Sequence, residues 1–250
     1  MSSKNLLLVT GWNDNLNYLR IKIVRDVQDI MSIYFRNDAL FRSPLLICLR
    51  SSVNCLTPTT VPCTHPDRSK ICITSTNSHW CQFVYQLSHE LCHCSTSQVQ
   101  LPQKIKWFDE FICCCSSFLV ETHISKQNDT KYNYMFGSDT SKNFYEYLNS
   151  QQIGHIYQKT NISDFFKNKR EEYEKNENLI KSHDFYVNEF FRKIGESLKG
   201  LSFVGKMRDV PLYNCDTIED YLSRLSFLCN SEEIETLKVI VDLFGLALDL

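Results

Sequence analysis

The residues of this chain that are best suited to chemistry are His89, Glu90 and His93. They form a His-Glu-x-x-His pattern. In a helix, side chains four positions apart lie one turn apart on the same face, so both imidazoles can reach one tetrahedral zinc ion. The carboxylate of Glu90 then lies to one side of the metal, where it can take a proton from a water molecule. The pattern predicts a catalytic zinc site with two histidine ligands and Glu90 as general base.

The helix expected over residues 78–96 has two unlike faces. At about 100° per residue, one side collects the apolar side chains, which are Trp80, Phe83, Val84, Leu87, Leu91 and Cys94. His89 and His93 fall on the opposite side, with Glu90 at its edge, and their polar neighbours there are Gln82, Tyr85 and Gln86. We therefore expect one face to enter the core and the other to line a cleft, with Asn77 or Ser78 as N-cap.

A third ligand is expected, because a catalytic zinc usually takes three protein ligands and leaves its fourth position to water. Asp109 and Glu110 lie in the first half of the next predicted helix, over residues 103–124. Glu110 lies opposite the apolar side of this helix, and Asp109 about a quarter-turn away. An unpaired carboxylate is costly to bury, and a zinc ion would remove that cost. Glu110 is the predicted ligand; Asp109 in its place, or a capping role for the acidic pair, are the alternatives.

These segments carry a family resemblance. His-Glu-Leu-Cys-His at 89–93, followed by Trp-Phe-Asp-Glu at 107–110 and a helix rich in cysteine and serine, resembles the gluzincin class of zinc peptidases. The pattern resembles in particular that of small bacterial zincin-like proteins. The resemblance covers roughly residues 70–124. It implies a zincin-like fold, zinc held by two histidines and the downstream glutamate, and a peptide or protein substrate.

Three further expectations follow from the resemblance. The strand predicted over 70–75 resembles the edge strand along which zincins pair an extended substrate. Where thermolysin-like enzymes have an acidic residue to orient a ligand histidine, this chain has Cys114, so that role falls to Glu121 or a backbone carbonyl. An oxyanion donor is also expected, and its candidates are Tyr132, Tyr134, Tyr145, His155, Tyr157 and His183. The remaining histidines, His65, His79 and His123, are not expected to bind metal.

Composition limits the other possibilities. The formal net charge is −2, with both signs scattered, which argues against a nucleic-acid partner or a polybasic membrane patch. The first apolar run, Leu6–Val9, is too short for a signal peptide, and no segment is long enough to span a bilayer, so a cytoplasmic protein is expected. The 12 cysteines have no zinc-ribbon or thioredoxin spacing and are expected to be reduced thiols in the core.

The strands and helices predicted around the site together indicate an α+β fold, with a small N-terminal sheet and a helical second half. A zincin-like core over 1–125 is expected to precede a connecting segment at 126–142 and a helical subdomain over 143–250. Strands are predicted at 45–49 and 70–75, separated by a loop over 51–69. The predicted helices span 16–42, 78–96, 103–124, 143–158, 163–199, 216–229 and 231–248.

Three alternatives to a peptidase remain from the sequence. The chain could keep the zinc fold as a catalytically silent regulatory or interaction module. It could use the same metal geometry against an electrophile other than a peptide bond. It could also bind no metal, with two histidines four positions apart by coincidence.

Overall fold

The computed structural model describes residues 7–12, 15–36, 45–49, 59–62, 69–75, 79–96, 101–126, 140–153, 161–182, 184–195 and 198–250. The chain divides into two compact units. The first unit comprises Met1–Ile33, Asn37–Cys94 and Ser116–Asn149, and the second comprises Tyr34–Arg36, Ser95–Cys115 and Ser150–Leu250. Across the described ranges, every helix is too short or too polar to cross a bilayer.

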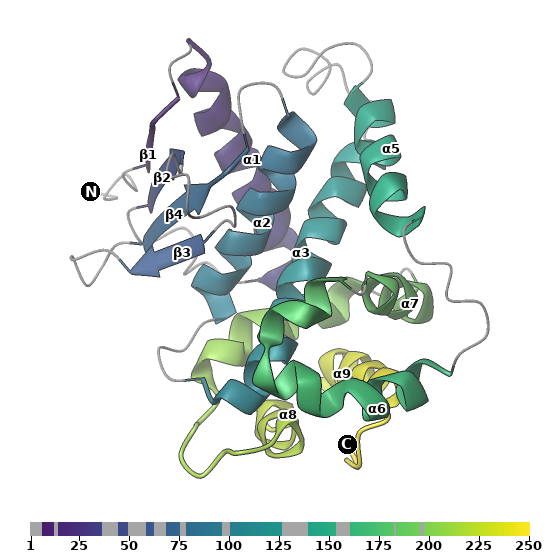
Figure 1. Cartoon of the computed structure of the whole chain (residues 1–250). Helices are drawn as coiled ribbons and strands as arrows, with labels where there is room; N and C mark the ends of the chain where they lie inside the picture. The colour runs from purple at the N-terminus through teal and green to yellow at the C-terminus, as the bar shows by residue number, and fades with distance from the viewer. Residues whose placement is uncertain are drawn as a thin grey trace. The chain divides into compact units, whose positions relative to one another are not determined.

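The first unit contains a four-stranded sheet (Figure 1). Its strands are β1 (Leu7–Thr10), β2 (Leu45–Leu49), β3 (Thr59–Pro62) and β4 (Ser69–Ile73), in the order β1-β2-β4-β3. The first three in that order run parallel, and β3 runs antiparallel to β4. The isoleucines of β2 and β4 are fully buried, as expected of strands in the middle of a sheet.

The strand predictions were partly right. The strand at 45–49 is confirmed as β2, and the one at 70–75 is β4, which ends earlier, at Ile73. The loop expected over 51–69 was wrong in part, because it contains β3. β4 therefore has a neighbour on each side and is not an edge strand. β1 was not predicted, since a run of four apolar residues has no alternation to identify it.

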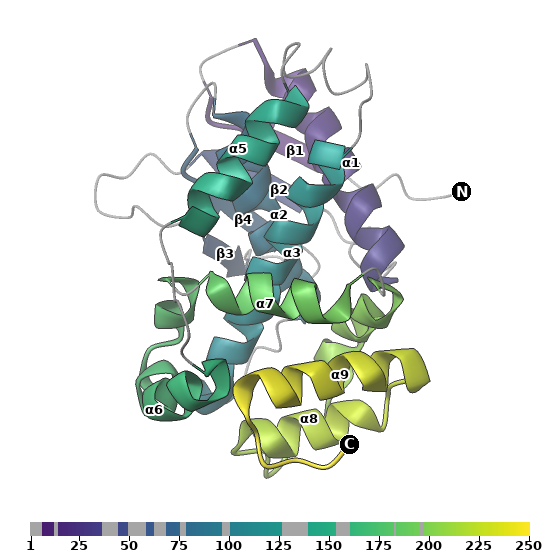
Figure 2. The ribbon, with the colours of Figure 1, turned by 90° about the vertical axis from the view of Figure 1, so that its right-hand side faces the viewer.

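Within the described residues, four helices contribute to the first unit. They are α1 (Asn17–Phe35), α2 (Trp80–Thr96), α3 (Lys106–Lys126) and α5 (Thr140–Ile153), and each also carries residues of the second unit. The turns of these helices that belong to the first unit lie on one face of the sheet (Figures 1 and 2). The buried guanidinium of Arg20 on α1 lies 4.6 Å from the ring centre of Trp12 and 5.5 Å from that of Trp80. This stacking joins α1 to the segment after β1 and to the start of α2.

The second unit is helical within the described residues. It contains η2 (Gln103–Ile105), the first turns of α3, α6 (Ile162–Lys175), η3 (Glu177–Ser182), α7 (Phe185–Ile194), η4 (Leu198–Asp209), α8 (Ile218–Ser226) and α9 (Ser231–Phe244). The single helix predicted over 163–199 was wrong. Asn176 ends α6 in an extended conformation, and Gly195 ends α7 with a φ of 57°.

The core of the second unit is aromatic. Phe244 at the end of α9 lies against Trp107, with ring centres 5.0 Å apart, and against Phe166, at 4.7 Å. Phe111 and Tyr186 contact the same phenyl ring. Trp107 and Phe111 lie on α3, so large buried rings hold the helix that carries Glu110 in this unit.

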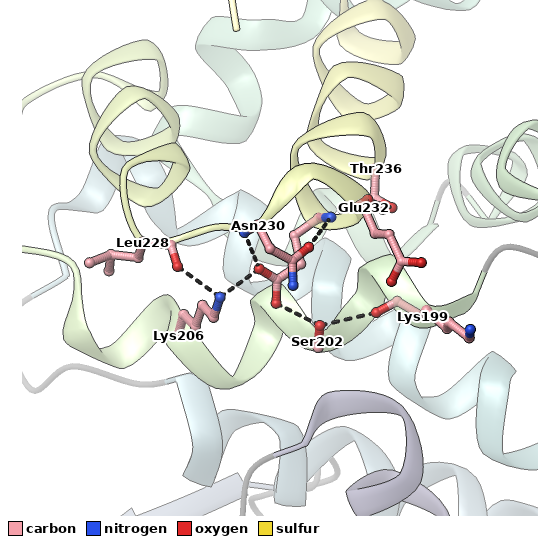
Figure 3. A network of polar contacts seen from close by, with 8 residues as sticks. Lys199, Ser202, Lys206, Leu228, Asn230, Glu232 and Thr236 are labelled. Atoms are coloured by element: carbon pink, nitrogen blue, oxygen red, sulfur yellow. Dashed lines mark hydrogen bonds and ion pairs between the residues drawn. The ribbon is translucent and has the colours of Figure 1, made fainter.

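A buried polar network crosses from η4 to α9 in the same unit (Figure 3). Glu233 accepts hydrogen bonds from the Ser202 hydroxyl and the Lys206 ammonium, each at 2.5 Å. It also accepts from the backbone N–H of Asn230, whose side chain accepts from the N–H of Glu233 in return. This reciprocal pair is a capping box that begins α9.

The predicted α+β class is confirmed at this coarse level, with a small sheet early in the chain and helices after it. The compact units differ from the predicted division. The first unit continues beyond the expected connecting segment to Asn149, and the second includes Ser95–Cys115 from the expected core. The described cysteines are free thiols, and the run at 113–115 is buried, as expected of small core residues.

Candidate metal centre

The helix that carries the His-Glu-x-x-His pattern is tied to the end of β4 by one side chain. The Gln86 amide oxygen accepts from the N–H groups of Thr74 and Ser75, at 3.0 and 3.1 Å. Its amide nitrogen donates to the Thr74 hydroxyl. The Ser75 hydroxyl donates to the carbonyl of His79, just before α2. These hydrogen bonds join the end of the strand to the helix and to the residue just before it.

His89 and His93 lie one turn apart on α2 with their rings in an edge-to-face arrangement. The ring centres are 4.9 Å apart and the ring planes are inclined by 77°. His89 is 5% exposed and Glu90 3%, whereas His93 is half-buried. The expectation of a polar, cleft-lining face was wrong for Gln86, His89 and Glu90, which are buried. The reason is that this face meets polar partners on other elements, as Gln86 does at the end of β4.

The helix α3 lies directly beside α2. The Ser117 hydroxyl donates to the carbonyl of Tyr85 at 2.9 Å, and the Ser116 hydroxyl donates to the carbonyl of Ser88 at 3.3 Å. As α2 advances by three residues its contact on α3 moves back by one, so the helices run antiparallel.

The predicted ligands are brought together. One potential ligand atom from each of His89, His93 and Glu110 lies within 4.8 Å of the other two. His93 forms a second such group with Asp109 and Cys113, so the alternative with Asp109 stays open. Two imidazole nitrogens and one carboxylate oxygen are the ligand types of a catalytic zinc centre. Ligand atoms around a tetrahedral zinc lie roughly 3.3 Å apart, a distance that follows from bonds of about 2.0–2.1 Å. Side-chain rotations would close the difference, and the residues fit the metal.

A lysine that the sequence did not single out contacts Glu110. The ammonium of Lys181 on η3 lies 2.8 Å from Oε2 of Glu110. The Glu110 side chain is 13% exposed and that of Lys181 35%. Lys181 follows a charge-rich helix and fits the pattern of a solvated surface residue, so no sequence signal distinguished it.

Glu121 does not take the orienting role expected of it. It lies one turn beyond Ser117 on α3, beside Cys81 at the start of α2, about two turns before His89. Both its carboxylate oxygens are buried, with no hydrogen-bond partner among the described residues. Burial raises the pKa of Glu121 well above its usual value. This carboxyl group belongs to the core of the first unit.

The other candidates are placed as follows. Tyr145 on α5 is largely exposed, while Tyr132, Tyr134, His155, Tyr157 and His183 lie outside the described residues, as do His65 and the expected N-cap residues Asn77 and Ser78. His79 is exposed. Burial lowers the pKa of His123, which opposes the favourable effect expected for a charged histidine at a helix end.

Comparisons with known proteins do not extend this description. No family model, no curated protein and no solved structure matches the chain. What the site does must therefore be argued from its own residues.

Proposed function

We propose that the protein is a zinc-dependent metallopeptidase. The observation that carries the proposal is the grouping of His89, His93 and Glu110, with two imidazoles one helical turn apart and a carboxylate within 4.8 Å of their nitrogens. This is the ligand set of a zinc centre that keeps one position open for chemistry. Glu90, between the histidines in sequence, supplies a carboxylate at the same turn of α2.

The roles follow from the chemistry of each group. His89, His93 and Glu110 would hold the metal, which when bound supplies a Lewis acid and activates water near neutral pH. Glu90 takes a proton from the attacking water and passes it to the leaving amine.

A peptide substrate is supported by the sheet. Within the described residues, β3 pairs with β4 alone, and its other edge is available for a further strand. An extended peptide can add to such an edge through main-chain hydrogen bonds. We therefore assign to β3 the substrate-pairing role that the sequence suggested for residues 70–75.

One observation favours a second function. His89 and Glu90 are at most 5% exposed, so a substrate must open the site to reach them. A site that never opens would be a zinc-stabilised interaction module without turnover. Activity measurements on variants that keep the metal separate the two functions.

The first experiment measures zinc in the purified protein after supplementation and dialysis. We expect about one zinc per chain in the wild type and a large loss in His93→Ala and Glu110→Ala, because a site that loses one of three ligands binds far more weakly. His79→Ala is the matched control, since this histidine is exposed beside the same helix. A zinc content well below half per chain in the wild type would exclude the metal site.

The second experiment compares hydrolysis of an unfolded protein by the wild type and Glu90→Gln. We expect Glu90→Gln to keep its zinc and lose activity by roughly 10²–10⁴-fold, the usual contribution of a general base. Glu146→Gln, an exposed substitution on α5, should leave both unchanged. Zinc binding without hydrolysis in the wild type would support the interaction module instead.

A further inference from the structure

The start of α3 has two contacts with η3, both within the second unit. The amide of Gln103, in the turn just before α3, donates to Oε2 of Glu177 at 2.6 Å. One helical turn later in η3, Lys181 reaches Glu110. Two contacts between the same pair of segments fix η3 alongside α3, so Lys181 is held at Glu110 by more than its own flexible side chain.

This ion pair differs from two other lysine–glutamate pairs of the chain. Lys175–Glu171 and Lys142–Glu146 are four positions apart on one helix, and each of these side chains is more than 60% exposed. Such pairs contribute little and tolerate many geometries. The pair of Lys181 and Glu110 joins two segments distant in sequence, and its carboxylate is mostly buried. A buried carboxylate with a charged donor is held in a defined orientation.

We propose that Lys181 positions Glu110 for metal binding, an inference that rests on the proposed function. The ammonium lies 2.8 Å from Oε2, so Glu110 would ligate the metal through one oxygen while Lys181 holds the other. Glu110 then supplies one ligand atom instead of two. A carboxylate that bound through both oxygens would take the position that a catalytic centre leaves open. Outer partners of this kind orient metal ligands and tune the affinity of the site.

The test measures zinc affinity of the whole chain by competition with a chromophoric chelator. Lys181→Met should weaken binding by roughly 10–100-fold, the usual effect of losing an outer partner. Lys181→Arg keeps a charged donor and should recover most of the affinity. Lys175→Met removes an exposed lysine that pairs with Glu171, and it should bind zinc as the wild type does.

Cobalt(II) in place of zinc gives a readout that a merely structural role would not change. Four-coordinate cobalt absorbs visible light much more strongly than five-coordinate cobalt. We expect an intense spectrum for the wild type and Lys181→Arg, and a weaker one for Lys181→Met, in which Glu110 can bind through both oxygens. If Lys181→Met does not fold, Lys181→Gln, which keeps a neutral donor, is measured in its place.

The outcomes separate this inference from the proposed function. Wild-type protein that binds no zinc overturns both. Zinc binding that is equal in wild type and Lys181→Met, with identical cobalt spectra, overturns the role of Lys181 and leaves the metal site standing. Tighter zinc binding by Lys181→Met also overturns it, because Lys181 would then compete with the metal for Glu110.

Discussion

Among the described residues, each unit buries one glutamate outside the proposed metal site, and these two glutamates have opposite surroundings. Glu233 in the second unit is 1% exposed and is surrounded by donors. Glu121 in the first unit is fully buried, and its oxygens have no hydrogen-bond partner among the described residues. A buried glutamate is therefore part of a polar network in one unit, whereas in the other unit it has no hydrogen-bond partner among the described residues.

The electrostatic consequences have opposite signs. Burial alone would raise the pKa of Glu233, but hydrogen bonds from Lys206, Ser202 and the Asn230 N–H outweigh it, and the pKa falls below its usual value. Nothing offsets burial at Glu121, so its pKa rises. The difference shows that burial by itself does not identify a functional carboxylate. Glu110 is distinguished by its position beside two histidines, not by the fact that it is shielded from water.

The largest effect is expected at Glu233. Glu233→Ala removes the acceptor of Ser202 and Lys206 and half of the capping box, and it should lower the free energy of unfolding by about 3 kcal/mol. Urea denaturation measures the change. Glu235→Ala, on the exposed side of α9, is the control and should change stability by no more than about 0.5 kcal/mol. Equal effects would mean that the network contributes nothing.

A second prediction concerns Glu121 and pH. Its folded-state pKa is raised, so its contribution to stability is complete below the ordinary pKa of 4.5 and is lost as the pH rises toward the folded-state value. The wild type should lose up to about 1.4 kcal/mol per pH unit in that range from this group. Glu121→Gln cannot ionise, so its stability relative to the wild type should increase between pH 5 and pH 8 in urea titrations.

Glu233→Gln provides the contrast for that experiment. Because the pKa of Glu233 is lowered, its contribution is present above the ordinary value and is lost as the pH falls through the folded-state value. Glu233→Gln should therefore be most destabilised near neutral pH and approach the wild type in acid. If both variants changed in the same direction with pH, the comparison between the two glutamates would fail.

The smallest effect is expected at the cysteines beside these glutamates. Burial, with Glu121 adding to it, raises the pKa of Cys81 to about 12. Burial and Glu233 raise that of Cys229 to about 11, where Lys206 acts in the opposite direction. Since the thiolate is the nucleophile, Cys81 should react with iodoacetamide roughly three- to tenfold more slowly than Cys229 at pH 8.5. Peptide mapping by mass spectrometry measures both rates, and the difference should vanish in urea.

Much of the site was predictable because it depends on local geometry. Once α2 is a helix, the spacing of His89 and His93 fixes their relation, and the short connection to α3 makes Glu110 a natural neighbour. Two binding partners of the site's helices were not predictable. Lys181 reaches Glu110 from a distant segment, and Gln86 bonds to the end of β4. Such contacts depend on tertiary packing, which leaves no periodic signal in the sequence.

The fold was predictable to a similar degree and for similar reasons. The long helices have periodic apolar faces, whereas β1 and β3 are four residues each and are defined by their neighbours in the sheet. The continuous helix expected over 163–199 fails because charged helix formers surround Asn176, and only its extended conformation shows that the helix ends there. Glu121 was mistaken for an outer partner of the metal because a helical wheel gives direction but not distance along the axis.

The bonds that Gln86 makes have a consequence for local unfolding. The N–H groups of Thr74 and Ser75 lie beyond the last residue of β4, where main-chain amides ordinarily exchange with solvent within a short time. Here both are held by a side chain of α2. Their hydrogen exchange should therefore follow the opening of the histidine-bearing helix instead of fraying with the strand. These two amides, just after the end of β4, therefore report on whether the helix that carries His89 and His93 is closed.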